Sequence, residues 1–175
     1  MDARRESELA PMKNRTTVER KSERELVATR TVNGPARIVF EAWTKPELFK
    51  RWWVPKSIGV SLLSCEMDVR VGGKYRLVFG NDPSTAMEFF GRYIEVTPCS
   101  RLVWTNDEGD EEGVVTTVTF EEKGGQTLLS VRDLYPSKEA LDAAVASGSS
   151  MDAMPETLEQ LDELVVSLAA SAGRS

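Results

Sequence analysis

Histidine is absent from the 175 residues of the chain. Without an imidazole there is no Ser-His-Asp or Cys-His catalytic arrangement, no histidine general base and no histidine metal ligand. Cysteine is scarce, because Cys65 and Cys99 are the only two, and they lack the CxxC spacing of redox and zinc motifs. We therefore expect two reduced, buried thiols, no metal site and no cofactor.

Long apolar runs are also absent, so no segment is expected to insert into or span a membrane. The first fifteen residues, MDARRESELAPMKNR, lack the apolar core of a secretion signal, and Met12 is an alternative start to Met1. These features predict a cytoplasmic protein.

Dense positive charge is missing too. The net charge is −6 and the sequence pI is about 4.9, which argues against a nucleic-acid partner. Hydrophobic residues make up 41% and charged residues 29%, as in a soluble globular domain. Charges of both signs alternate near the start, which predicts a flexible tail over residues 1–24. We expect one domain over 25–170 and a short flexible tail over 171–175.

The first structured segment is rich in Val and Thr. ELVATRTVNGP, residues 25–35, predicts a strand that ends in a turn. A helix is expected from Pro35 to Thr44, because proline suits a first helical turn. Pro46 starts a second short helix over 46–53.

Six further segments have the composition of short strands and are separated by Gly, Pro, Asn or Asp. They are 60–71, 72–79, 87–96, 101–107, 114–122 and 127–135. Short turns between consecutive strands favour one antiparallel meander, which gives about seven strands together with the first.

The C-terminal part is helical in pattern. A short helix is expected after a Ser137 cap, and a long helix after an Asp152 cap. The long helix carries an apolar stripe of Met151, Met154, Leu158, Leu161, Val165 and Leu168. Burying six such side chains contributes roughly 10 kcal/mol before entropy, so this helix should pack against the sheet. A curved sheet around such a helix leaves room for a ligand cavity.

Residues 25–135 contain four phrases that together resemble a known family: TRTVNGPARIVFEAWTKPELFKRWW, DVRVGGKYRLVF, GRYIEVTPCSRLVWT and VVTTVTFEEKGGQTLLSV. In this order they are similar to the helix-grip superfamily called START-like or SRPBCC. Within it they look like the branch named after the activator of the Hsp90 ATPase. ETLEQLDELVVSL fits the last helix of the superfamily. The resemblance implies an α+β helix-grip fold, in which a curved antiparallel sheet wraps around a long C-terminal helix and holds hydrophobic ligands.

The pocket candidates are the side chains that strand alternation and the helical stripe turn inward. They are Trp53, Tyr75, Leu77, Phe79, Phe89, Tyr93, Leu102, Trp104, Val118, Met154, Leu158 and Leu161. The alternative for each is a place in a filled core. Tyr75 and Tyr93 would offer hydroxyls to a polar ligand atom, and Met154 an adaptable wall.

Three of the four tryptophans lie in FEAWTKPELFKRWW, residues 40–53. Trp43 is expected to be scaffold, since a helical aromatic stripe usually packs. Trp52 and Trp53 point about 100° apart on a helix, so they cannot be equally buried. We expect one of them at a rim, and Trp53 is the candidate for the cavity mouth.

Two charged segments invite a catalytic or metal-binding interpretation. Glu66 and Asp68 share a strand face opposite Cys65, Met67 and Val69, which makes that face the solvated one. The acidic stretch NDEGDEEG, residues 106–113, lacks the ligand spacing of a calcium loop, so a hairpin tip is the better interpretation. No catalytic or metal-binding residue is assigned.

Three functions remain open, and none follows from the fold alone. The first is binding of an apolar, lipid-like or polyketide-like small molecule. The second is a cyclase or aromatase type of enzyme, which would need an inward titratable group such as Glu95 or Asp133. The third is a chaperone partner, the least transferable, because the eukaryotic activator uses a separate N-terminal domain as well. An uncovered strand edge would permit a homodimer without requiring one.

Overall fold

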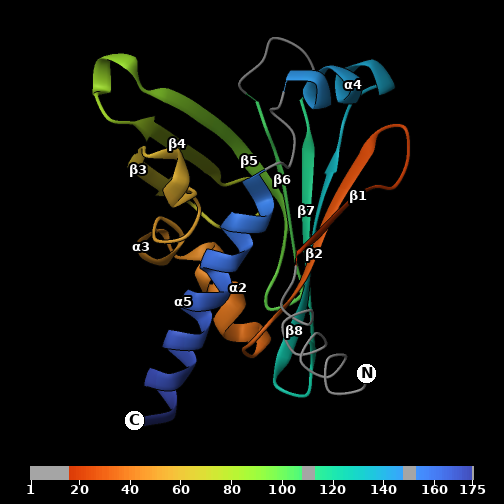
Figure 1. Ribbon diagram of the computed structural model, residues 1–175. Coiled ribbons are helices and arrows are strands. Elements are labelled where there is room, and N and C mark those ends of the chain that lie inside the picture. Colours follow the sequence, from red (N-terminus) through yellow and green to blue (C-terminus); the bar gives the residue numbers. More distant parts are fainter. Residues whose placement is uncertain (1–15, 108–112, 148–152, 175) are drawn as a thin grey trace, which may run out of the picture.

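A curved antiparallel sheet with helices on one face forms the molecule (Figure 1). The computed structural model describes residues 16–107, 113–147 and 153–174. The strands are β1 Thr17–Arg20, β2 Glu25–Val32, β3 Ser61–Met67, β4 Lys74–Gly80, β5 Met87–Thr97, β6 Arg101–Thr105, β7 Val115–Lys123 and β8 Gln126–Leu134. The helices are α2 Ala36–Thr44, α3 Pro46–Phe49, α4 Lys138–Ser147 and α5 Met154–Arg174, with 3-10 turns η1 Lys56–Ile58 and η2 Pro83–Thr85.

The sheet order is β1-β2-β8-β7-β6-β5-β4-β3, and every neighbouring pair is antiparallel. Strands β3 to β8 form the predicted meander, and β2 joins it beside β8. This arrangement confirms the α+β helix-grip class. The α5 helix lies across the concave side together with α2 (Figure 1).

The described sheet has eight strands rather than about seven. The additional strand is β1, whose Thr17 pairs with Thr29 and whose Arg20 pairs with Leu26. It falls inside the segment 1–24 that was expected to be a flexible tail. All four of its residues are exposed, so no apolar alternation marked it in the sequence, and pairing to the edge of β2 is what orders it.

The predicted second helix is shorter than expected. It covers only Pro46–Phe49, and Trp52 and Trp53 follow in a series of turns. Trp52 is fully buried and donates its indole N–H to Ala42 O at 2.9 Å. Trp53 is half-buried, as the different directions of two neighbouring side chains require.

Helix α5 is attached to β2 by a buried ion pair. Both Arg30 and Asp162 are less than a tenth exposed, and the guanidinium contacts Asp162 Oδ2 at 3.1 Å. The other carboxylate oxygen accepts the backbone N–H of Asn33 at 3.0 Å. Next to it, a Cβ on Gly34 would lie 2.3 Å from Val165 Cγ1, so glycine permits the close approach of the two segments.

Three local expectations have clear outcomes. Ser137 Oγ accepts the Ala140 N–H at 3.0 Å, so the predicted cap of α4 is confirmed. The expected burial of Cys99 is wrong, because it is exposed in the β5–β6 turn with φ of 61°. Glu66 and Asp68 are exposed and pair with Arg76 and Arg70.

The C-terminal helix extends further than expected, since α5 reaches Arg174 inside the predicted tail 171–175. Met151, the expected cap Asp152 and the acidic tip 108–112 lie outside the described residues. Among the described helices, none combines the length and apolarity needed to cross a membrane.

Replacing Asp162 by Ala should lower the free energy of unfolding by about 3–5 kcal/mol, because Arg30 would remain buried without its partner. Asp142 is the matched control. It pairs with Arg20 at 2.7 Å, but both side chains are more than a third exposed. Asp142→Ala should therefore cost less than about 1 kcal/mol. Chemical denaturation measures both variants, and equal losses would contradict the role given to the buried pair.

Candidate functional site

A cavity of two adjoining chambers lies between the concave face of the sheet and the helical side. The inner chamber has a volume of about 210 Å³ and the outer chamber about 460 Å³. Their shared walls are Trp53, Phe79, Phe89, Trp104 and Asn106. The two chambers therefore meet at a partition that is aromatic except for one amide.

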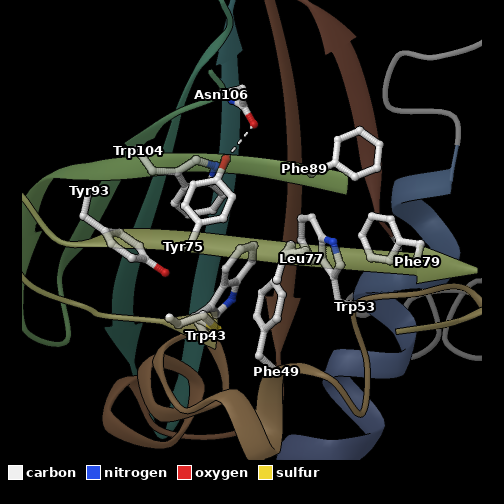
Figure 2. A pocket seen from close by; sticks show the side chains of 11 residues that line it. Trp43, Phe49, Trp53, Tyr75, Leu77, Phe79, Phe89, Tyr93, Trp104 and Asn106 are labelled. Atoms are coloured by element: carbon white, nitrogen blue, oxygen red, sulfur yellow. Dashed lines mark hydrogen bonds between the residues drawn. The ribbon is translucent and has the colours of Figure 1, made fainter. Parts of the chain in front are cut away.

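The inner chamber is almost entirely apolar. Its walls are Trp43, Phe49, Trp53, Met67, Tyr75, Leu77, Phe79, Phe89, Tyr93, Trp104 and Asn106. Alternate residues of β4 and β5 project into it, and Trp43 and Phe49 close it from the helical side (Figure 2). Such a chamber favours a flat or aliphatic group, which loses contact with water on entry.

Trp43 organises the aromatic wall. Its ring lies 4.7 Å from the Trp52 ring, 5.8 Å from Trp53 and 5.8 Å from Trp104, measured between ring centroids. Its indole Nε1 is buried and donates to no acceptor in the described part of the chain. Interlocked rings of this kind resist rearrangement, so the chamber is a preformed shape.

A glutamine of α5 holds the segment that carries Trp53. Gln160 Nε2 donates to Trp52 O at 2.8 Å and to Val54 O at 3.0 Å, and its Oε1 accepts the Lys56 N–H at 2.9 Å. The Trp53 ring stacks on Phe49 with centroids 4.8 Å apart. The position of Trp53 between the chambers is thus fixed both by the hydrogen bonds from Gln160 to the neighbouring backbone and by the stacking of its ring on Phe49.

A glycine leaves space for the Tyr75 ring in the wall of the inner chamber. Gly91 pairs with Tyr75 across β4 and β5. A Cβ there would lie 1.9 Å from Thr105 O and 2.9 Å from Tyr75 Cε2, so a larger residue would displace the ring. The Tyr75 hydroxyl can then reach Thr105 O at 2.8 Å and Asn106 Oδ1 at 3.0 Å (Figure 2).

From Asn106 a chain of hydrogen bonds leads into the outer chamber. Asn106 Nδ2 donates to Val114 O at 2.7 Å and to Thr116 Oγ1 at 3.3 Å. The Thr116 hydroxyl donates to Asp133 Oδ1 at 2.8 Å. Asn106, Thr116 and Asp133 all line the outer chamber, so the polar groups gather at one side of a mostly apolar space.

Asp133 is the carboxyl group of the cavity. Burial raises its pKa to about 6, against the opposing effect of the hydrogen bond from Thr116. Burial and then the charge of Asp133 raise the pKa of Tyr135 to about 12, and burial raises the pKa of Tyr93. Both tyrosines therefore stay neutral at physiological pH, and Asp133 is mostly ionised.

The structure distributes the twelve pocket candidates between wall and core. Seven line the inner chamber: Trp53, Tyr75, Leu77, Phe79, Phe89, Tyr93 and Trp104. Met154 lines the outer chamber. Leu102, Val118, Leu158 and Leu161 are fully buried in the packed core and line neither chamber. They belong to the apolar core cluster, in which α2 contacts β7 and β8 and α5 contacts β1, β2 and α2.

Several wall residues were absent from the sequence-based set. Asn106 and Thr116 look like a turn residue and a strand residue. Gln160, which lines neither chamber but binds the backbone next to Trp53, looks like a solvated helix position. Trp43 was expected to be scaffold, and it is both buried and part of the wall. A polar residue at an inward strand position, such as Thr116 between Val114 and Val118, was the one available signal. Of the two titratable groups considered, Glu95 pairs with Arg101 at 3.1 Å outside both chambers, and Asp133 faces the outer one.

An eight-stranded antiparallel sheet, a long C-terminal helix and a cavity between them define the chain as a helix-grip protein of the START-like superfamily. A family model described as "Activator of Hsp90 ATPase homolog 1-like protein" matches residues 33–166. The chain therefore belongs to that family.

Solved structures agree with this assignment. A crystal structure of a protein from Nitrosomonas europaea is 25% identical, covers 86% of this chain and 99% of its own, and has a TM-score of 0.75. A protein from Rhodobacter sphaeroides is 23% identical, with coverage of 87% and 99% and a TM-score of 0.75. An AHSA1-like protein from Aeromonas hydrophila is 19% identical, with coverage of 79% and 93% and a TM-score of 0.60. None of the curated proteins matches the chain.

Asp133→Asn should stabilise the protein at neutral pH. The raised pKa, about 6 against an ordinary 3.8, means that the folded state resists ionisation. Protonated Asp133 therefore makes its full contribution to the free energy of unfolding below pH 4, near the ordinary pKa. This contribution is lost as the pH rises through the folded-state pKa of about 6. At pH 7.5 the variant should be more stable by on the order of 2–3 kcal/mol, and at pH 4 the difference should vanish.

Urea unfolding at pH 4 to 8 measures this difference. Tyr135, the other titratable side chain among the described residues of the outer chamber, does not ionise in that range. Glu95→Gln removes a carboxylate from an exposed ion pair and should change stability by less than about 1 kcal/mol. If Asp133→Asn is less stable than the unchanged protein at pH 7.5, the expected destabilisation by the buried charge of Asp133 is wrong.

Proposed function

We propose that this protein binds a small apolar or aromatic molecule in the two-chambered cavity. The observation that carries the proposal is the inner chamber, a space of about 210 Å³ walled by ten apolar or aromatic side chains and one amide. Ligand sites typically combine apolar walls with a few polar groups that fix orientation. Here Asn106 stands at the partition, and Thr116 and Asp133 lie in the outer chamber.

Keeping the inner chamber unfilled lowers the stability of the protein, which favours a functional role for it. Filling the inner chamber with larger side chains would add buried apolar contact and stability. The aromatic rings instead pack against one another around the inner chamber. Gln160 holds the segment that carries Trp53 by three hydrogen bonds. A preformed site lowers the ordering cost of binding. The family's name points to chaperone activation, but the feature of this chain that supports a function is the cavity.

A second candidate function is catalysis by Asp133. A carboxyl with a pKa of about 6 in an aromatic chamber can exchange a proton with a bound molecule near neutral pH. This meets the condition set for a cyclase type of enzyme, and Glu95 does not meet it. Binding alone remains the first proposal, because Asp133 is the only carboxyl group among the described residues of the outer chamber, and a second carboxyl to share acid and base roles does not lie with it there.

Native mass spectrometry of freshly purified protein tests the binding proposal directly. A discrete excess mass that disappears on denaturation is expected, and its size would give the chemical class of the ligand. If a compound is found, incubation with the protein separates the two candidates. Its recovery unchanged supports binding. If the protein converts the compound and Asp133→Asn abolishes the conversion, the function is catalysis rather than binding alone.

Leu77→Phe should weaken binding of the neutral dye Nile red about tenfold, because the larger side chain projects into the inner chamber. The matched control is Val78→Phe, the neighbouring position on the opposite face of β4, which lines neither chamber. Fluorescence titration measures both, after thermal melting has shown that both fold. The proposal fails if the dye does not bind, or if the two variants bind it equally.

A further inference from the structure

The carboxylate of Asp133 is only half satisfied by the protein. Its Oδ1 accepts the Thr116 hydroxyl at 2.8 Å. Its Oδ2 accepts no hydrogen bond from the residues that the structure describes, and no ion pair in that part of the chain includes Asp133. A carboxylate held in a partly apolar chamber without a cation normally acquires one or gives up its charge.

The nearby cations are committed elsewhere. Arg132 precedes Asp133 on β8, so it points to the other face of the sheet, where it pairs with Glu25 at 3.5 Å. Arg24, just before β2, donates its Nε to Tyr135 O at 2.9 Å and forms no ion pair with Asp133 in the described part of the chain. The described walls of the outer chamber contain no lysine or arginine. A positive charge for Asp133 would therefore come from a ligand.

The two side chains of the hydrogen-bonded chain that ends at Asp133, Thr116 and Asn106, already use their donors. The Thr116 hydroxyl proton is used on Asp133 itself. Asn106 Nδ2 donates to Val114 O and to Thr116 Oγ1. A ligand atom beside the free carboxylate oxygen is thus best matched by a hydrogen-bond donor, and a carboxylic acid or phosphate would be repelled.

Aromatic rings flank the same space. Trp53, Trp104 and Tyr135 line the outer chamber with Asp133. The faces of such rings attract a cation, because the π-electrons make the ring faces negative. Two independent features, an unpaired carboxylate oxygen and aromatic walls, select the same kind of group.

We propose that the ligand is an amphipathic amine, whose flat apolar part enters the inner chamber and whose protonated nitrogen donates to Oδ2 of Asp133. This inference rests on the proposed binding function and specifies the chemical class of its ligand. Hydrogen bonds to charged groups contribute about 1.5–3 kcal/mol, which corresponds to roughly 10- to 100-fold in affinity. The amine should be preferred over a neutral counterpart of the same shape by that factor.

Three probes of the same shape test the charge requirement: naphthylethylamine, naphthylethanol and naphthylacetic acid. Isothermal titration calorimetry at pH 7.5 measures their affinities for the full chain. The amine should bind at least tenfold more tightly than the alcohol, and the acid should bind most weakly. Asp133→Asn should lower the affinity for the amine to that of the alcohol and leave the alcohol within about twofold.

Glu95→Gln is the matched control, because it removes the same charge outside both chambers and should leave the amine preference intact. Unchanged alcohol binding by Asp133→Asn shows that its cavity is folded. Equal binding of amine and alcohol, or a preference that survives Asp133→Asn, overturns the amine inference and leaves cavity binding standing. Binding of Nile red but of none of the three probes has the same meaning. Failure of all four compounds to bind removes the proposed function and the inference together.

Discussion

The docking of α5 across the sheet is the constraint on which the cavity depends. Arg30 and Asp162 form a buried ion pair below the helix, where water cannot solvate either charge. Two residues earlier, Gln160 binds the backbone around Trp53. One face of α5 thus anchors β2, and another fixes the wall of the ligand space. The helix contacts the β1–β2 side of the sheet, so the β4–β6 side is left to face the shorter α3 segment and remains hollow.

In the proposed binding function, the two chambers have different roles. The inner one offers shape and apolar surface, and the outer one offers a carboxylate with a fixed orientation. They are connected by the hydrogen bonds from Tyr75 through Asn106 and Thr116 to Asp133, which cross from β4 to β8 through the middle of the sheet. The Thr116 hydroxyl proton goes to Asp133, and the Tyr75 hydroxyl proton is shared between Thr105 O and Asn106 Oδ1, so these side chains orient one another.

Asp133 has a cost to the fold that a neutral residue would not have. Burial disfavours its charged form, and the protein supplies a hydroxyl but no cation to offset this. A group that lowers stability at an accessible cavity is typical of functional sites, where stability is exchanged for recognition or catalysis. Glu95 and Arg101, by contrast, form an ion pair with both side chains exposed.

The sequence by itself determined the elements and the class of fold. Strand alternation and the stripe on α5 are local patterns that predicted the meander and the long helix. Alternation in β4, β5 and β6 also predicted six of the inner-chamber residues, and the different directions of Trp52 and Trp53 predicted the seventh, Trp53. Tertiary structure decided the rest. Leu102 and Leu77 have the same inward pattern, but tertiary packing buries Leu102 completely in the core and leaves Leu77 in the wall of the inner chamber. Asn106, Thr116 and Asp133 come from different segments and form a site only through strand register. β1 carries no apolar signal and is ordered by its partner, because edge pairing depends on backbone hydrogen bonds that side chains do not encode.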